Sequence, residues 1–418
     1  MAAMSASRKL FERLAGPWTV LGQRDYALLF WGQLISATGT QMQVVAVAWQ
    51  VYALTHSPLA LGVIGLLQAL PRLLFSLPSG VLADVLDRRR LLIVVSATMM
   101  ALSGVLALCT GLKGISVGII YVVVFLGASV SAFDFPTRQA VIPALVPREH
   151  LVNALAFSSL MTQVTFIVGP TAGGFAIAWL GLANTYWLDV ASYLAAIGTL
   201  CLLVVPRVPL ERRARPGAGA LVEGLRFLHT RRLILVVLIL DLCANFFGEP
   251  SALLPFYARD ILHSGSQGLG LLLAAPSVGA VALAPVIGLF GRMKRRGLGV
   301  TLAPMVWGLC IAAFGLFPDP FWPGLLLLAG AGAADMVSIY LRSLIIQTNT
   351  PDEFRGRVSS VVALCSLGGP LLGQFESGLV AGLFSPMISL VSGGLACALV
   401  ALLIVAIVPG LLHLRARE

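Results

Sequence analysis

Charge is scarce in this chain. Only 11% of the 418 residues are Asp, Glu, Lys or Arg, whereas 58% are hydrophobic. A soluble globular domain carries about twice that share of charged residues, so the composition excludes one and indicates a protein embedded in a lipid bilayer. The ten-residue alternating pattern of an outer-membrane barrel is also missing, which leaves helices as the spanning elements.

Lysine is rarer still. Lys9, Lys113 and Lys294 are the three lysines, and they follow Arg, Leu and Met. None can form the Gly-Lys step of a phosphate-binding loop, which excludes ATP as the direct energy source. An ion gradient remains as the energy source, unless the protein moves a solute passively and needs none.

Cysteine and histidine form no ligand pattern. The chain has no CxxC motif, no histidine at ligand spacing and no evident arrangement of nucleophile, base and oxyanion donors. This argues against a disulfide framework, a zinc site and an enzyme, so we expect no catalytic residues, no metal and no cofactor. All six cysteines lie inside predicted spans: Cys109, Cys201, Cys243, Cys310, Cys365 and Cys397.

Long apolar runs are plentiful, and each is close to the roughly 20 residues that a helix needs to cross a bilayer. They predict an all-α integral membrane protein with twelve transmembrane helices. We place these at 27–53, 58–83, 91–112, 115–135, 151–178, 186–206, 232–257, 268–290, 298–317, 323–346, 358–382 and 387–411.

The basic residues lie on one side of this arrangement. With the N-terminus inside, the inner loops, tails and adjoining span ends hold 25 of the 28 Lys and Arg residues. The bias predicts that both termini are cytoplasmic, as in a multi-pass protein of a bacterial inner membrane. It also explains the net charge of +10 without a nucleic-acid partner.

The chain resembles itself at offsets of 200 and 208 residues. "VGPTAGG" at 168–174 aligns with "GGPLLGQ" at 368–374, and "LTHSPLALG" at 54–62 aligns with "LHSGSQGLG" at 262–270. An even number of spans in each copy predicts two parallel six-helix bundles with substrate bound between them. We expect an N-terminal half at 1–206, a cytoplasmic linker at 207–231 and a C-terminal half at 232–418. Within the linker, "ALVEGLRFLHTRR" is a candidate for a short basic helix on the membrane surface.

The loop after the second span carries the most specific motif. "SGVLADVLDRRRLL" at 79–92 resembles the Gly-x-Leu-x-Asp-Arg-x-Gly-Arg-Arg signature of the major facilitator superfamily, although Val85 and Asp87 depart from it. The resemblance implies a conformational latch in which Asp84 caps the eleventh span and the arginines pair with an acid of the fourth span. The latch residues are Gly80, Asp84, Arg88, Arg89 and Asp134.

Further stretches resemble the enterobactin-exporter-like branch of drug and siderophore efflux proteins: "GTQMQVVAVAWQVYALTHSPLALG", "FDFPTRQAVIPALVPREHLVNALAFSS", "GPTAGG" and "TPDEFRGRV". The stretch "GPTAGG" is similar to a fifth-span element of antiporters. It also predicts close helix packing with a proline kink. Its residues are Gly169, Pro170, Gly173 and Gly174.

A proton-coupled carrier needs an acid inside the membrane. Asp241 and Asp335 fall nearest the middle of predicted spans, with Glu249 and Glu376 in the outer half. Asp241 also has a plain alternative as a structural helix contact, and Arg342 could hold Asp335 in a fixed ion pair. Arg72, buried in the second span, is expected to pair with such an acid rather than to bind substrate.

In the family that the chain resembles, spans 1, 4, 7 and 10 line the substrate cavity. Amides and aromatics with few charges suit an amphipathic organic molecule, although aromatic residues of membrane helices commonly serve packing alone. The candidates are Gln43, Trp49, Gln50, Asn245, Phe246 and Tyr340.

The sequence therefore predicts a monomeric, proton-coupled exporter of small amphipathic molecules, with protons and the bilayer as its other partners. Two alternatives stay open. One keeps the fold but imports a solute or moves it passively, and the other is a sensor or lipid scramblase that tolerates loss of the membrane acids.

Overall fold

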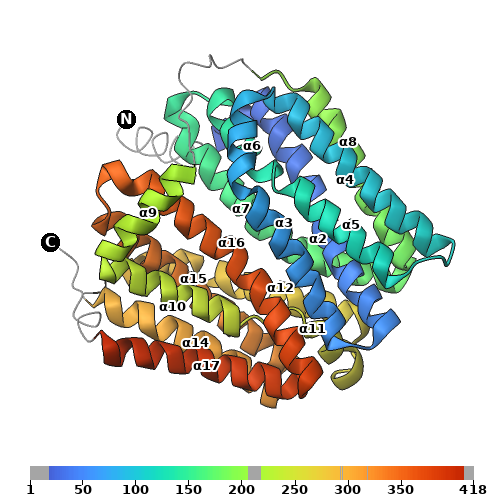
Figure 1. Cartoon of the computed structure of the whole chain (residues 1–418). Helices are drawn as coiled ribbons and strands as arrows, with labels where there is room; N and C mark the ends of the chain where they lie inside the picture. The colour runs from blue at the N-terminus through green and yellow to red at the C-terminus, as the bar shows by residue number, and fades with distance from the viewer. Residues whose placement is uncertain (1–17, 206–217, 292, 294, 318, 409–418) are drawn as a thin grey trace, which may run out of the picture.

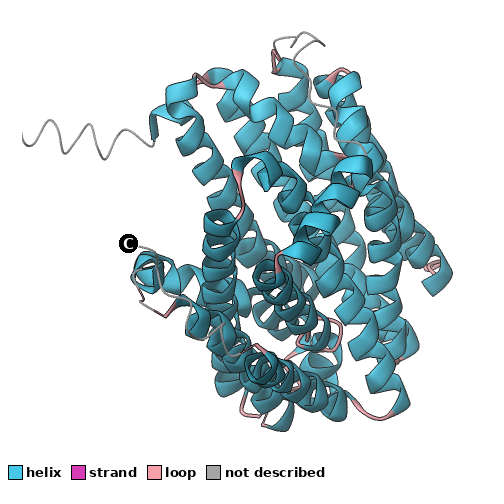
Figure 2. Ribbon diagram, turned by 60° about the vertical axis from the view of Figure 1, so that its left-hand side comes forward, coloured by secondary structure: helices cyan, strands magenta, loops and turns pink. Residues whose placement is uncertain are grey.

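The computed structural model describes residues 18–205, 218–291, 293, 295–317 and 319–408. Within these residues the regular elements are helices, joined by short loops (Figure 2). An all-helical chain keeps its backbone hydrogen bonds inside each segment, which the interior of a bilayer requires.

The N-terminal helices are η1 (Trp18–Gly22), α2 (Arg24–Thr55), α3 (Pro58–Val85), α4 (Arg88–Gly111), α5 (Val117–Ser131), α6 (Asp134–Leu145), η2 (Arg148–His150), α7 (Leu151–Leu180) and α8 (Leu182–Leu202). The remaining ones are α9 (Ala218–Thr230), α10 (Arg232–Phe247), α11 (Leu254–Phe256), η4 (Tyr257–Ile261), α12 (Gly265–Leu283), η5 (Ala284–Val286), α13 (Ile287–Gly291), α14 (Arg296–Leu316), α15 (Phe321–Asn349), α16 (Asp352–Leu383) and α17 (Pro386–Ile407).

Ten helical segments of the described chain are long and apolar enough to cross a membrane. The first and seventh predicted spans, α2 and α10, are not among them. Four glutamines make α2 polar, and α10 has only 16 residues before Gly248 and Pro250 interrupt it. The multi-pass helical architecture is confirmed, whereas the count of twelve stays a prediction.

Two predicted boundaries were wrong. The stretch at 136–150, expected as a loop, is mostly helical, because α6 continues the fourth span after a break at Ala132 and Phe133. Pro136 lies in the first turn of α6, where a missing N–H costs nothing. The seventh span, expected to reach residue 257, gives way to α11 and the π-helix η4.

The helices form two bundles (Figure 1). Helices α2 to α8 pack together, and α10 to α17 form the second group; α3 and α7 of the first lie against α16 and α12 of the second. Glycines permit both close crossings. A Cβ on Gly62 would lie 2.9 Å from Cα of Gly378, and one on Gly174 would lie 3.0 Å from Cα of Gly270.

The internal repeat recurs in the packing. A Cβ on Gly173 would lie 2.8 Å from the backbone of Met42 in α2, and one on Gly373 would lie 2.5 Å from the backbone of Asn245 in α10. Helix α7 thus packs on α2, the first helix of its bundle, and α16 packs in the same way on α10, the first helix of the second bundle. Equivalent residues 200 positions apart make equivalent contacts, as duplicated bundles require.

Helix α9 occupies the predicted linker, so the expected short helix is confirmed. It packs on the start of α16: Glu223 pairs with Arg357 at 2.9 Å, and the Phe227 and Phe354 rings stack with centroids 4.4 Å apart. Residues 206–217, the rest of the linker, lie outside the described chain.

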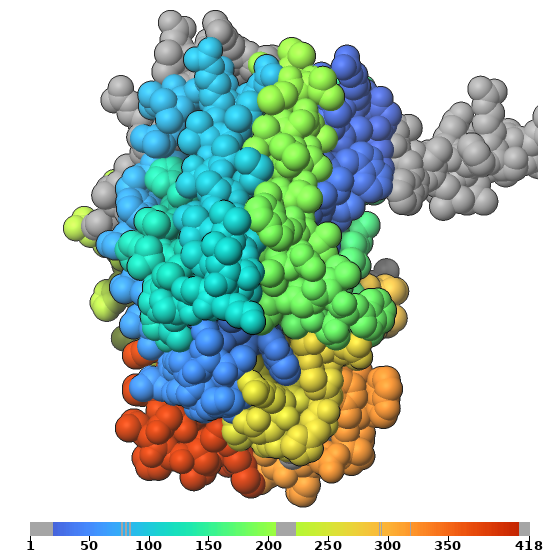
Figure 3. Space-filling view, turned by 90° about the vertical axis from the view of Figure 1, so that its right-hand side faces the viewer, coloured from blue at the N-terminus to red at the C-terminus, as the bar shows by residue number. Residues whose placement is uncertain are grey.

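At the far end of the molecule, opposite the start of α2, the two bundles touch. The Tyr52 hydroxyl of α2 donates a hydrogen bond to Asp260 of η4, and the Arg259 guanidinium lies 6.0 Å from the centroid of the Trp49 ring. Figure 3 shows the N-terminal surface (blue to green) meeting the C-terminal one (yellow to red) without a gap on the face it presents. This end of the structure is closed.

Candidate substrate cavity

A cavity of about 650 Å³ lies between the first bundle and α16. Its lining residues on α2 run from Gln33 to the middle of the helix at Gln41. Those on α16 fall in the first half of that helix, and those on α3 fall in the second half. The cavity is therefore nearer the end where α2 begins, on the opposite side from the Tyr52–Asp260 contact. Its polar lining comprises Gln33, Ser36, Thr40, Gln41, Arg72, Ser76, Ser79, Ser131, Asp134, Arg138, Tyr193 and Ser360.

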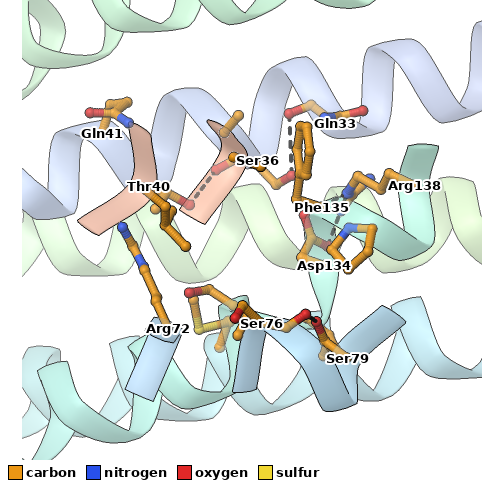
Figure 4. Close-up of a pocket in the computed structure, with 18 of the residues that line it drawn as sticks. Gln33, Ser36, Thr40, Gln41, Arg72, Ser76, Ser79, Asp134, Phe135 and Arg138 are labelled. Carbon is orange, nitrogen blue, oxygen red and sulfur yellow. Dashed lines mark hydrogen bonds and ion pairs between the residues drawn. The ribbon is translucent and has the colours of Figure 1, made fainter. Parts of the chain in front are cut away.

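Helix α2 supplies one wall. Gln33, Ser36 and Thr40 stand at i, i+3 and i+7, which places them on one helical face, and Figure 4 shows them along this side. The Thr40 and Tyr193 hydroxyls lie 2.8 Å apart, which joins α2 to α8. The remaining wall is apolar, with Val95, Met99, Phe135, Leu364 and Leu367.

Three charged side chains line the cavity. Asp134 and Arg138 neutralise each other, because Nε of Arg138 lies 2.9 and 2.8 Å from the two carboxylate oxygens. Arg72 makes no ion pair or hydrogen bond with any residue in the described part of the chain. Figure 4 shows its side chain reaching from α3 toward Thr40. Among the described residues, Arg72 therefore lacks the acidic partner that was expected for it.

The family pattern of lining spans is met in part. Helices α2 and α5–α6, the first and fourth spans, contribute, but α10 and α15 do not contribute to this cavity, whereas α3, α4, α8 and α16 do. The bundles meet along α3 and α16 here, so these helices bound the space.

The two glutamines predicted to line a cavity do not line this one. Gln43 Nε2 donates to Ser103 of α4 over 3.1 Å, and Gln50 is 3% exposed. Gln50 donates to Thr110 at 3.0 Å and accepts from Tyr186 at 2.7 Å. The side of α2 with these two glutamines faces α4 and α8, and their amides hold the bundle together.

The other four cavity candidates also lie elsewhere. Trp49 is at the closed end under Arg259, and Asn245 donates to Asp241 in its own helix at 3.0 Å. Phe246 packs edge-to-face on Phe247, and Tyr340 covers Gly291. Of these four residues, Asn245 donates to an acid, Asp241, that also forms an ion pair.

That pair joins Asp241 of α10 to Arg342 of α15, with both side chains buried. The expectation that Arg342 compensates Asp335 was wrong, because a helix neighbour two turns away in sequence is farther than a facing helix. Breaking a buried ion pair is costly, because it leaves the remaining charge without a partner. This geometry favours the structural alternative for Asp241.

Asp335, Glu249 and Glu376 keep partly exposed side chains on α15, the α10–α11 turn and α16. Glu249 accepts a hydrogen bond from the Ser251 amide at 3.1 Å. No ion pair is formed by these three acids with the residues described, so each stays a candidate for proton binding.

Sequence reasoning missed Asp189. It is fully buried in α8 and accepts hydrogen bonds from Ser103 at 2.6 Å and from Ser192 at 3.3 Å. Gln43 donates to the same Ser103, so the acid belongs to a network linking α2, α4 and α8. The predicted span began at residue 186 and placed Asp189 at its edge, whereas α8 begins at Leu182.

The latch residues are described in part. Arg88 donates to the carbonyl of Ala140 at 2.6 Å, and Arg89 to that of Leu200 at 2.8 Å. Asp134, offered as an arginine partner, pairs with Arg138. Gly80 and Asp84 lie in the last turns of α3 with side-chain positions outside the described set, so the latch stays a prediction.

In the packing motif on α7, Gly169, Gly173 and Gly174 are all buried, with Pro170 inside the helix. Gly169 and Gly173 face α2, and Gly174 faces α12. The motif therefore contacts both bundles. Among the described residues, no three His, Cys, Asp or Glu side chains gather as metal ligands.

Comparison with known proteins gives concordant matches. Curated relatives include the multidrug efflux pump Tap of Mycolicibacterium fortuitum, 28% identical over 82% of this chain and 86% of that protein. The enterobactin exporter EntS of Escherichia coli K12 is 27% identical over 93% of each chain.

Solved structures share the fold at low identity. The nucleoside transporter NupG superposes with a TM-score of 0.72 at 11% identity, covering 92% of this chain and 98% of the other. A bacterial homologue of the lysosomal transporter Spinster, in an inward-facing and unoccupied conformation, gives 0.65 at 16% identity over 94% and 96%.

The family model described as transmembrane secretion effector matches residues 15–418. Together with the two packed bundles and the apolar helices, this match shows that the chain belongs to that family of the major facilitator superfamily and is a multi-pass membrane transporter, not an enzyme.

Proposed function

We propose that this transporter is a proton-coupled exporter of small amphipathic organic molecules, of the drug or siderophore type named for its relatives. The observation that carries the proposal is the cavity. Its volume suits a drug-sized molecule, and amides and hydroxyls on α2, α3 and α8 face an apolar wall on α4, α6 and α16.

The conformation supports export by alternating access. From the basic-residue bias we infer that α2 begins in the cytoplasm. With this orientation the cavity lies on the cytoplasmic side, and the Tyr52–Asp260 contact closes the outer side. An exporter in this state is ready to load. We infer a monomer in a bacterial inner membrane, divided at 1–206, 207–231 and 232–418.

Coupling is assigned to the unpaired acids. Asp241 is held by Arg342, which leaves Asp335 of α15 as the foremost proton carrier, with Glu249 and Glu376 as the other candidates.

The test uses everted membrane vesicles with an acidified interior and a pH-quenched dye. Addition of a transported catechol compound, lipophilic cation or antibiotic should release protons and restore fluorescence. Asp335→Asn should abolish recovery, while the matched exposed variant Asp352→Asn should leave it intact.

Recovery that survives Asp335→Asn would move coupling to Glu249 or Glu376. Equilibration of a compound without proton movement would favour the passive carrier, and release of a compound from preloaded everted vesicles would favour the importer. Lipid movement that survives loss of all three acids would favour the scramblase.

A further inference from the structure

We propose that the cavity selects organic anions, and that Arg72 supplies the positive charge that recognises them. This deepens the proposed export function, on which it rests, by naming the chemical class of the substrate.

Arg72 lies at the middle of helix α3, a predicted membrane span. It is 14 residues from the start of α3 at Pro58 and 13 from its end at Val85, about 20 Å from either end at 1.5 Å per residue. A charged side chain at this depth is costly unless it is paired or lines a polar cavity, and it marks a functional position.

Its charge is not compensated by any residue in the described part of the chain. No described side chain or carbonyl accepts a bond from Arg72. The cavity's lining acid, Asp134, is engaged through both oxygens by Arg138. With Arg72 and Arg138 against Asp134, the lining carries a net charge of +1.

The other membrane acids do not supply the missing anion. Asp241 is bound to Arg342, and Asp189 is enclosed by Ser103 and Ser192. Asp335, Glu249 and Glu376 are not among the residues that line this cavity. A bound substrate is then the group able to neutralise the guanidinium.

The surroundings of Arg72 define the rest of the ligand. Thr40 and Gln41 of α2 face it across the cavity, and Ser76 lies one turn along α3 (Figure 4). Guanidinium, amide and hydroxyl groups together bind a carboxylate, sulfonate or phenolate. The apolar wall beyond them accommodates a hydrophobic body.

Three dansyl probes separate charge from shape. Dansylglycine is an anion, dansylamide is neutral and dansylcadaverine is a cation, and all carry the same ring system. Binding is measured by equilibrium dialysis against the full-length protein in lipid nanodiscs. We expect dansylglycine to bind about tenfold or more tightly than dansylamide, because a bond to a charged partner is worth that much.

Arg72→Gln should remove this preference by weakening dansylglycine alone, and Arg72→Lys should retain part of it. The exposed Arg355→Gln should leave it unchanged, which controls for loss of one positive charge. Equal binding of all three probes to the unmodified protein, or equal weakening of all three by Arg72→Gln, would overturn the proposal. The probe comparison on the unmodified protein decides the matter even where a variant fails to fold.

Flux of the same probes in everted vesicles keeps the two proposals apart. If dansylcadaverine is exported and dansylglycine is not, the proposal of anion selection is refuted and the proposal of export is supported. If dansylglycine binds in a manner that depends on Arg72 but none of the probes is transported, the proposal of anion selection is supported and the proposal of export is refuted.

Discussion

Tyr52 and Asp260 meet across the two bundles at their closed end, and they stand 208 positions apart. This separation equals the offset at which "LTHSPLALG" aligns with "LHSGSQGLG". Positions equivalent in the duplication thus contact each other, as residues beside a pseudo-two-fold axis do.

Tyr52→Phe should open this end. It removes a hydrogen bond to a carboxylate, worth about 1.5–3 kcal/mol, from the closed state alone. Spin labels at positions 112 and 317, in exposed turns of opposite bundles at this end, should move apart in double electron–electron resonance. Tyr121→Phe is the matched control, because Tyr121 bonds Ala60 within one bundle; a similar shift in this control would contradict the assignment.

Asp241→Asn or Arg342→Gln should each destabilise the protein strongly. Removing one partner of a buried pair leaves an uncompensated charge and costs about 3–5 kcal/mol, whereas the double variant should lose less than the sum. The free energy of unfolding in mixed micelles measures this. Asp352→Asn, which breaks an exposed pair with Arg355, should have little effect. Strict additivity of the two buried variants would refute the pairing.

Gly174→Ala should impair transport at least tenfold. The added Cβ would lie 2.4 Å from the Ser266 carbonyl oxygen of α12, and this backbone cannot yield without separating the bundles. Dye recovery in vesicles measures the loss. Gly104→Ala in α4, where nothing lies within 4 Å of the new Cβ, should transport normally; an unaffected Gly174→Ala would argue against close contact at this crossing.

Asp189→Leu should destabilise the first bundle by about 1–3 kcal/mol, because the Ser103 hydroxyl loses its buried acceptor. Asp189→Asn keeps a carbonyl oxygen in that place and should cost less. Thermal unfolding of both variants gives the comparison. If the two substitutions are equally damaging, the negative charge rather than the hydrogen bond is required there.

The architecture was predictable because apolar length and the repeat report directly on the bilayer. Boundaries failed where polar residues occur inside a helix: Asp134 and Pro136 mimicked a loop, and Asp189 was mistaken for the edge of a span. A hydropathy pattern averages over neighbours and does not distinguish a polar group that solvent covers from one that another helix covers.

The candidate site was less predictable than the fold. Gln43 of α2 was expected to line the cavity, but it faces the bundle interior, whereas Thr40, less than one turn earlier, lines the cavity. The partner of Arg342 lies on another helix, and a single sequence carries no record of such pairings. Only Arg72, a lone cation in an apolar span, was visible in advance, and its surroundings changed its interpretation.

The polarity of α2 also bears on how the protein is made. Helix α2 is synthesised before α4 and α8, although it is less apolar than either, and its glutamines find partners on both. Helix α8 begins at Leu182, well over a hundred residues after α2 ends at Thr55. The Gln50 carbonyl therefore lacks its Tyr186 partner until α8 is synthesised, and we expect a chain truncated before α8 to hold α2 in the bilayer less stably than the full-length chain.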